Sequence, residues 1–344
     1  MAHRFTSHTA EFNVLPSKQS AYRPFNSTET AILSVHNDLV RAIDNRHISL
    51  LVLLDLSAAF DTVDHDILLS VLEHRFAVHG TALDWFRSYL RERTQSFVFA
   101  GKQTMAYHVD CSVPQGSVLY PLGFVAYRPT DDITDTIEQH DVWPHLYADD
   151  TKLRASCKPE DVSAMRQHLG SCVTDVSYWC AARRLQLNSD KTEAIWIGSR
   201  AAINKLTAQD RLLTVSNDTT VNPTDVVRDL GVFLDTELSM KQHIAKVAAT
   251  CFYHIRRLRQ IRRRVGQAVT TRLVLAMITS RLDYCNWVLA GLPQQTLEPL
   301  QKVQNSAARL IFNFSHHDHV SPCLIQLHWL PVRAHIQYKL CSLM

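Results

Sequence analysis

The fold is decided by the stretch Leu51-Val-Leu-Leu-Asp55-Leu-Ser-Ala-Ala-Phe60-Asp61, which has a later counterpart in Val142-Trp-Pro-His-Leu-Tyr147-Ala-Asp149-Asp150. In both stretches a short apolar run leads into aspartates. Apolar runs of this length, bounded by polar residues, are typical of buried strands. A carboxylate at the end of a buried strand is unfavourable unless a positive group compensates its charge. Two such strands side by side would bring Asp55, Asp149 and Asp150 together.

Three carboxylates at the ends of neighbouring strands favour a pair of divalent cations. Hard cations such as Mg²⁺ prefer oxygen ligands and keep positions open for water and phosphates. Two metals roughly 4 Å apart can hold the attacking and the leaving oxygen of a phosphoryl transfer. Each cluster alone has an ordinary alternative, because Asp149-Asp150 also suits a polar hairpin turn and Asp55 a plain strand end.

Three further motifs occur in the chain, namely Val113-Pro-Gln-Gly-Ser117, Leu187-Asn-Ser-Asp-Lys-Thr-Glu193 and Asp229-Leu-Gly-Val232. Together with the two acidic stretches, and in this order, they resemble the motifs of the reverse transcriptases of non-LTR (LINE-type) retrotransposons, in particular the Jockey-like group. The match extends with few gaps from about Gln19 to the C-terminus. The resemblance implies an RNA-directed DNA polymerase that transfers deoxynucleotides to a primer 3′-hydroxyl by a two-metal mechanism.

The resemblance also implies catalytic roles for four residues. Asp55, Asp149 and Asp150 would hold the two Mg²⁺ ions. Lys191 would lie near the triphosphate, where an ammonium group can protonate the leaving pyrophosphate. A surface lysine in a polar loop is the ordinary alternative for Lys191.

Four other residues are expected at the substrate by the same resemblance. Phe60 would lie beneath the incoming sugar, where its ring collides with a ribose 2′-hydroxyl. Gln115 and Gly116 would lie against the nucleotide or the template base. Arg23 belongs to the remaining part of the fingers, which contact the triphosphate. A core aromatic is the alternative for Phe60, and a turn before a helix is the alternative for Gln115 and Gly116.

An arginine cluster lies within nine positions of one predicted helix and contains no acidic residue: Arg256, Arg257, Arg259, Arg262, Arg263 and Arg264. Unbalanced clusters of this kind are typical of phosphate binding. The position resembles the thumb, which holds the template–primer duplex. A solvated helix surface is the alternative.

The pattern of elements predicts an α+β fold followed by a helical part. We expect a right-hand polymerase palm with partial fingers and a C-terminal helical thumb. The expected divisions are a truncated fingers remnant at 1–45, the palm at 46–235, and the helical thumb with a C-terminal extension at 236–344. Periodicity predicts helices at 26–44, 67–76, 82–91, 162–179, 239–262, 266–285 and 293–312, and strands at 48–55, 193–198, 212–215 and 226–234.

Composition limits the compartment and the partners. The eight cysteines have no paired spacing and no signal peptide opens the chain, which favours reduced thiols and a nuclear or cytoplasmic location. No apolar run approaches the ~20 residues of a membrane span. A formal net charge of +3 does not by itself indicate a polyanionic partner. The resemblance supplies the expected partners, which are an RNA template, a DNA primer and deoxynucleoside triphosphates.

Two positions depart from the family pattern, since Ser112 and Tyr120 replace customary glycines. Where such a position requires a positive φ, a side chain is strained. Together with the shortened fingers, these departures favour an alternative function, a catalytically inactive, truncated retrotransposon remnant that only binds nucleic acid. An RNA-binding splicing factor of the intron-encoded type is disfavoured, because the C-terminal residues resemble the retrotransposon family throughout.

Overall fold

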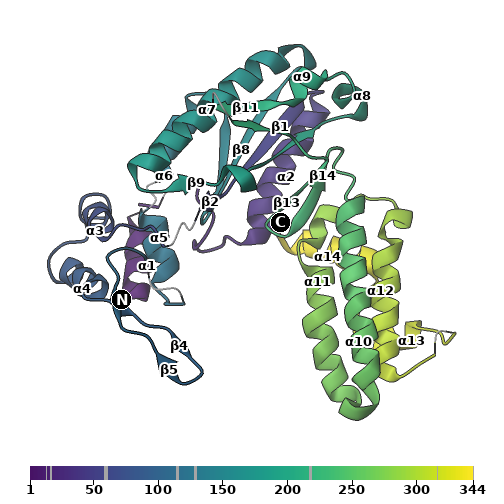
Figure 1. The fold of residues 1–344 in the computed structure, drawn as a ribbon. Helices are drawn as coiled ribbons and strands as arrows, with labels where there is room; N and C mark the ends of the chain where they lie inside the picture. Colours follow the sequence, from purple (N-terminus) through teal and green to yellow (C-terminus); the bar gives the residue numbers. More distant parts are fainter. Residues whose placement is uncertain are drawn as a thin grey trace. The chain divides into compact units, whose positions relative to one another are not determined.

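A computed structural model describes residues 1–12, 14–15, 18–57, 61–113, 116–127, 130–216, 219–315 and 317–343 (Figure 1). The contacts within the chain divide it into two compact units, Met1–Thr224 and Asp225–Met344. The first unit mixes helices with strands, and the second is helical in its described residues apart from one hairpin. The predicted α+β class with a helical C-terminal part is confirmed. The units divide earlier than the expected palm boundary at 235, because that hairpin belongs to the helical unit.

The first unit contains the following elements: α1 (Ala2–Glu11), α2 (Thr28–Asp44), β1 (Ile48–Leu54), β2 (Leu56–Ser57), α3 (His65–His74), α4 (Gly80–Leu90), β3 (Thr94–Gln95), β4 (Val98–Phe99), β5 (Lys102–Gln103), β6 (Tyr107–His108), α5 (Tyr120–Tyr127), α6 (Thr130–Glu138), β7 (Trp143–Tyr147), β8 (Asp150–Cys157), η1 (Pro159–Asp161), α7 (Val162–Ala182), β9 (Gln186–Leu187), η2 (Ser189–Lys191), β10 (Glu193–Ile197), α8 (Arg200–Ile203), α9 (Ala208–Arg211), β11 (Leu213–Ser216) and β12 (Thr219–Val221).

A four-stranded antiparallel sheet in the order β10-β1-β8-β7 forms the centre of this unit. Strand β1 is buried along almost its whole length, as its continuous apolar run predicts. It pairs directly with β8, so that Leu54 lies opposite Thr151 and Leu53 opposite Lys152. The expectation that the two apolar runs form strands side by side is wrong, because the runs are β1 and β7 and β8 lies between them in the sheet. The acidic stretches still meet at one end of the sheet, because the chain turns directly from β7 into β8, and β8 pairs with β1.

The two faces of the sheet are covered by different helices. Leu50, Val52 and Leu54 alternate along β1 and pack in one core with apolar residues of α7. Helix α2 covers the opposite face, where its Asp38 carboxylate lies 3.1 Å from His145 Nε2 and 3.7 Å from Arg154 Nη2. The sheet is thus held on both sides.

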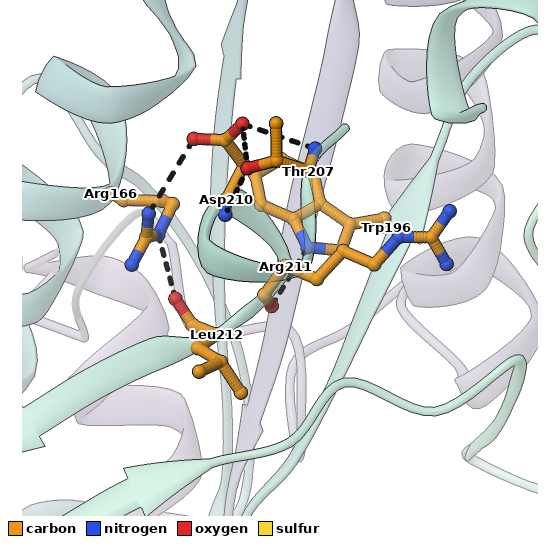
Figure 2. A network of polar contacts seen from close by, with 6 residues as sticks. All are labelled: Arg166, Trp196, Thr207, Asp210, Arg211 and Leu212. Carbon is orange, nitrogen blue, oxygen red and sulfur yellow. Dashed lines mark hydrogen bonds and ion pairs between the residues drawn. The ribbon is translucent and has the colours of Figure 1, made fainter. Parts of the chain in front are cut away.

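A polar network attaches α7 to the segment that follows β10 (Figure 2). Arg166 of α7 donates from Nε to the Leu212 carbonyl at 2.6 Å, and its Nη1 lies 3.8 Å from Asp210 Oδ1. The Asp210 carboxylate also accepts from the Thr207 hydroxyl and amide, and these hydrogen bonds lower the pKa of its carboxyl. Trp196 of β10 donates from Nε1 to the Arg211 carbonyl at 3.2 Å. These bonds fix the edge strand beside β1.

Two local features at the N-terminus differ from the sequence expectations. Residues 1–25 have no clear periodicity of apolar residues, yet α1 forms. The centroid of its Phe5 ring lies 5.7 Å from that of Phe76 and 5.8 Å from that of Phe86. Helix α2 begins at Thr28 instead of at residue 26, because Ser27 and Thr30 form a reciprocal capping box at its start.

The second unit contains the following elements: β13 (Val226–Asp229), β14 (Val232–Asp235), α10 (Lys241–Val274), η3 (Leu275–Thr279), α11 (Ser280–Asp283), η4 (Asn286–Leu289), α12 (Gln294–Phe312), α13 (Ser321–Gln326) and α14 (Val332–Leu343). Helices α10 and α12 pack against each other (Figure 1).

Two glycines of the second unit explain where its elements end. The sequence predicts one strand at 226–234, but the chain turns at Leu230-Gly231, where both residues have a positive φ. The Tyr284 hydroxyl donates to the Leu230 carbonyl and so closes this turn. Helix α10 is interrupted at Gly266, whose φ is 73°, and it therefore consists of two helices, as the sequence predicts. No described helix has both the length and the apolarity needed to cross a membrane.

Candidate active site and nucleic-acid surface

The aspartates of the two acidic stretches lie at one end of the sheet. Asp55 follows Leu54 at the end of β1, and Asp150 precedes Thr151 at the beginning of β8. Because Leu54 and Thr151 are paired, the register places Asp55 and Asp150 at the same end of neighbouring antiparallel strands. Both side chains are partly exposed, so they are accessible to a ligand.

Asp149 lies in the tight turn that joins β7 to β8. Tyr147 pairs with Asp150, which leaves Ala148 and Asp149 as the two central residues of the turn. Ala148 is buried and has a φ of 52°, a conformation in which glycine is the usual residue. Gln19 donates from Nε2 to the Ala148 carbonyl at 3.2 Å and accepts from the Ala148 amide at 2.9 Å through Oε1.

Two tyrosines accompany the turn. Burial raises the pKa of the Tyr22 hydroxyl, and the charges of Tyr147 and Asp149 raise it further. Burial followed by the charge of Asp150 raises the pKa of the Tyr147 hydroxyl. Both groups are therefore neutral hydrogen-bond donors at neutral pH.

The fourth motif folds onto the first. Strand β9 pairs with β2, and the Asn188 amide donates to the Asp55 carbonyl at 2.9 Å. This contact brings Lys191 Nζ to 3.2 Å from Asp55 Oδ2. The Lys191 side chain is 69% exposed and that of Asp55 32%, so the pair contributes at most ~1 kcal/mol to stability. Lys191 supplies the positive charge that the strand-end carboxylate requires.

The carboxylates suit divalent cations in their chemistry but are not arranged as a metal site in the part of the chain that the structure describes. Across the described residues, no group of three carboxylate, histidine or cysteine side chains is arranged to hold a metal ion. The donor chemistry nevertheless suits Mg²⁺, because Asp55, Asp149 and Asp150 offer only hard oxygen ligands. Lys191 holds one oxygen of Asp55, so a cation at that oxygen would replace an ammonium group.

The structure describes two of the four residues that the resemblance places at the substrate. Phe60 and Gln115 lie outside the described residues. Gly116 is described, exposed, and has a φ of 84°. Arg23 donates from its guanidinium to the Gln19 carbonyl at 3.4 Å and to the Leu15 carbonyl at 3.3 Å. Arg23 thus holds its own loop, and its contact with a triphosphate stays a prediction.

The two glycine replacements behave differently. Ser112 has a φ of 82°, so this position does require the conformation that glycine adopts readily. Its backbone is fixed by the Val63 carbonyl, which accepts from the Ser112 amide at 2.8 Å, and by a 2.7 Å hydrogen bond between its carbonyl and His65 Nε2. Tyr120 is the first residue of α5 and has no positive φ. The expected strain therefore applies to Ser112.

The arginine cluster has two kinds of members. Five are exposed along α10: Arg256, Arg257, Arg259, Arg263 and Arg264. Arg262 is half-buried and donates to the Leu310 carbonyl at 3.0 Å and to the Ile311 carbonyl at 2.6 Å. It therefore caps the last turn of α12, which leaves backbone carbonyls without helical partners. Arg257 lies near Tyr253, with Nη1 3.3 Å from the hydroxyl.

Two basic hollows lie in the second unit. Arg259, Arg263 and Arg309 line one of about 540 Å³ between α10 and α12. Another, of about 720 Å³, lies against the β13–β14 hairpin and is lined by further basic residues that no single sequence cluster indicates: Arg228, Lys246 and Arg281. The unit thus has more cationic surface than the sequence motif predicts.

Sequence reasoning also missed two residues near the carboxylates. Gln19 marks the start of the resemblance, which implies no role for its side chain. Lys152 is 2% exposed and lies on the same face of β8 as Asp150, two residues away. A polar residue with no local pattern gives no sequence signal for burial of this kind.

Known proteins similar to this chain agree with the motifs. Residues 1–234 match the family described as reverse transcriptase (RNA-dependent DNA polymerase). The "Probable RNA-directed DNA polymerase from transposon BS" of Drosophila melanogaster is 26% identical over 264 residues, which cover 75% of this chain and 28% of that protein. The RNA-directed DNA polymerase from the mobile element jockey of the same species is 24% identical over 68% of this chain and 25% of that protein.

Solved structures with a similar arrangement are telomerases. The Candida albicans telomerase in complex with the TWJ fragment of telomeric RNA aligns with 98% of this chain and 57% of its own chain, at a TM-score of 0.47 and 11% identity. Apo telomerase from Candida tropicalis, truncated from the C-terminal domain, aligns with 68% of this chain and 42% of its own, at a TM-score of 0.46 and 12% identity.

The extent of the match decides the family. It covers more than half of the chain and includes all five motifs, and the curated relatives come from mobile elements of the kind that the resemblance predicted. The chain spans only about a quarter of the length of those relatives, 28% and 25%. The central sheet with its strand-end aspartates is accordingly a polymerase palm, and the chain belongs to the reverse transcriptase (RNA-dependent DNA polymerase) family.

Proposed function

We propose that this chain is the polymerase core of a non-LTR retrotransposon reverse transcriptase. It extends a primer 3′-hydroxyl with deoxynucleotides on an RNA template. The observation that carries the proposal is the convergence of three separate motifs at one end of the sheet. The β1–β8 register brings Asp55 and Asp150 to that end, and Lys191 contacts Asp55 there.

The first unit would carry the chemistry. Asp55, Asp149 and Asp150 are the residues that would hold two Mg²⁺ ions, which when bound neutralise the triphosphate and acidify the 3′-hydroxyl. Lys191 is exposed and cationic, so it is available to donate a proton to the leaving pyrophosphate. Phe60, at the end of the first motif, would exclude ribonucleotides by contact with the 2′-hydroxyl.

The second unit would bind the template–primer duplex. Its five exposed arginines on α10 present guanidinium groups to solvent, and guanidinium binds phosphate oxygens in a planar, bidentate geometry. Contacts of this type do not read base sequence. Arg262 is excluded from this set because its guanidinium is committed to the α12 carbonyls.

Replacement of two exposed arginines tests this surface. Arg256→Ala combined with Arg263→Ala should lower the affinity for an RNA–DNA hybrid about tenfold at physiological salt, largely regardless of hybrid sequence. Each lost phosphate contact should reduce the slope of log K against log[salt] by a little under one. Binding is measured by fluorescence anisotropy over a series of salt concentrations.

Two control variants separate the possible causes. Arg46→Ala with Arg200→Ala removes the same charge from exposed positions of the first unit and should leave the slope unchanged. Arg262→Ala should instead lower the free energy of unfolding by ~1–3 kcal/mol, because two carbonyls lose their donor. If Arg256→Ala with Arg263→Ala left the slope of log K against log[salt] unchanged, the arginine cluster would be a solvated helix surface.

Primer extension tests the proposed activity itself. The purified chain is incubated with Mg²⁺, deoxynucleotides and a DNA primer annealed to an RNA template, and extended products are resolved on a gel. We expect templated extension. A chain that binds the hybrid without extending it would support the alternative function, that of an inactive remnant that only binds nucleic acid.

A further inference from the structure

The turn that carries Asp149 is held by a side chain 129 residues away in the sequence. Gln19 uses both ends of its amide on the backbone of Ala148, donating to the carbonyl at 3.2 Å and accepting from the N–H at 2.9 Å. Its Oε1 also accepts from the Ala21 amide at 3.0 Å. The Gln19 residue is 1% exposed, so these bonds are shielded from water.

The turn needs such a partner for two reasons. Ala148 has a φ of 52°, which for a residue with a Cβ costs roughly 1–2 kcal/mol. Ala148 is also 6% exposed, and the Gln19 amide is a hydrogen-bond partner both for its buried N–H and for its buried C=O. Both requirements concern the residue that directly precedes Asp149.

The backbone around Gln19 is itself fixed to the sheet. Gln19 forms a parallel bridge with Leu146, the Ser20 amide donates to the Leu146 carbonyl at 2.9 Å, and the Leu146 amide donates to the Lys18 carbonyl at 3.3 Å. The amide group is therefore presented to the turn from a short segment that is locked onto β7. A segment anchored this way has little freedom to withdraw its side chain.

We propose that Gln19 is a positioning residue for the carboxylates of the β7–β8 turn. By fixing Ala148 in its positive-φ conformation, Gln19 sets the backbone conformation of the turn. That conformation determines the orientation of the Asp149 side chain and the position of Asp150 at the beginning of β8. The catalytic consequence rests on the proposed polymerase function, whereas the contact between Gln19 and Ala148 does not.

Hydrogen exchange tests the contact without any activity. Gln19→Met retains the length of the side chain and removes its polar atoms. We expect the Ala148 amide to exchange about tenfold faster, while amides within β1 and β8 keep their rates. Exchange is followed by mass spectrometry on overlapping peptides that span residues 143–153. An unchanged rate at Ala148 would overturn the proposal.

The matched control is a buried glutamine of the second unit. Gln304 is 6% exposed and donates to the Leu330 carbonyl at 2.9 Å, so Gln304→Met removes a comparable buried amide. It should lower stability and leave exchange at Ala148 unchanged. A general loss of stability is thereby distinguished from the local effect of Gln19.

Kinetics then test the positioning role. Gln19→Met should lower kcat for primer extension by about 10- to 100-fold, with the KM for deoxynucleotide and the Kd for hybrid changed less than threefold. Gln19→Met combined with Ala148→Gly should recover part of kcat, because glycine adopts the positive φ without help. This double variant also serves if the single variant folds poorly.

The outcomes separate the two proposals. Faster exchange at Ala148 with an unchanged kcat would overturn the positioning role and leave Gln19 as a structural residue. A wild-type chain without extension activity would overturn the proposed function, and the exchange measurement would still decide whether Gln19 holds the turn.

Discussion

Asp149→Asn should abolish primer extension, with a loss of at least about a thousandfold in the single-turnover rate. Asparagine has the size of aspartate but lacks the negative charge with which Asp149 would hold a divalent cation. The two hydrogen bonds between the Gln19 side chain and the Ala148 backbone do not involve the Asp149 carboxylate, so the substitution leaves them in place. The folded structure should therefore persist, and without metal its stability should be equal or greater because one of several like charges is removed.

The control for this variant is Asp141→Asn. Asp141 is exposed in the loop before β7 and should tolerate the same chemical change without loss of activity. The affinity of Asp149→Asn for an RNA–DNA hybrid should match that of the wild-type chain, since the arginines proposed to bind phosphate lie in the other unit. Extension retained in purified Asp149→Asn protein would remove Asp149 from the active site.

Acid should destabilise the second unit through His243. Burial lowers the pKa of the His243 imidazole to about 4, from 6.5 in the unfolded chain, and its Nδ1 accepts from the Phe233 amide at 3.4 Å. Between pH 6.5 and 4 the unfolded chain binds more protons than the folded one, so the free energy of unfolding falls as the pH falls. From pH 7 to 4.5 we expect a loss of about 2–3 kcal/mol from this group, measured by urea unfolding.

His243→Asn isolates that contribution. Asparagine offers an acceptor near the position of Nδ1 but does not titrate, so its pH dependence should be shallower by the same amount. His319→Asn, at an exposed position of the same unit, should leave the wild-type pH dependence unchanged. Identical acid profiles for wild-type and His243→Asn proteins would show that His243 is not protonated on unfolding in this range.

The parts of the fold that follow from local pattern were predictable. The apolar run of β1, the apolar stripe of α7 and the long helices of the second unit each repeat a period that depends on near neighbours alone. Helix α1 was missed because its short apolar face gains stability from Phe76 and Phe86, which lie far along the chain. The turn inside 226–234 was missed because its apolar pattern continues through Leu230-Gly231.

The candidate site was predictable to the level of motifs and not to the level of contacts. The order of the motifs places Asp55, Asp150 and Lys191 in one family site, and the structure brings Lys191 onto Asp55. The density of arginines predicts a basic helix, but it does not distinguish Arg262, which caps α12, from its exposed neighbours. That distinction depends on where a second helix ends.

The long separation between Gln19 and Ala148 has a consequence for synthesis of the protein on the ribosome. The contact between Gln19 and the turn that bears Asp149 cannot form until β7 and β8 emerge, so the segment around residue 19 must stay available from the beginning of translation. A gene copy whose reading frame began after codon 19 would still encode Asp55, Asp149 and Asp150. Its product would lack the residue proposed to position two of them, so a search for the acidic motifs alone would also count copies without this contact.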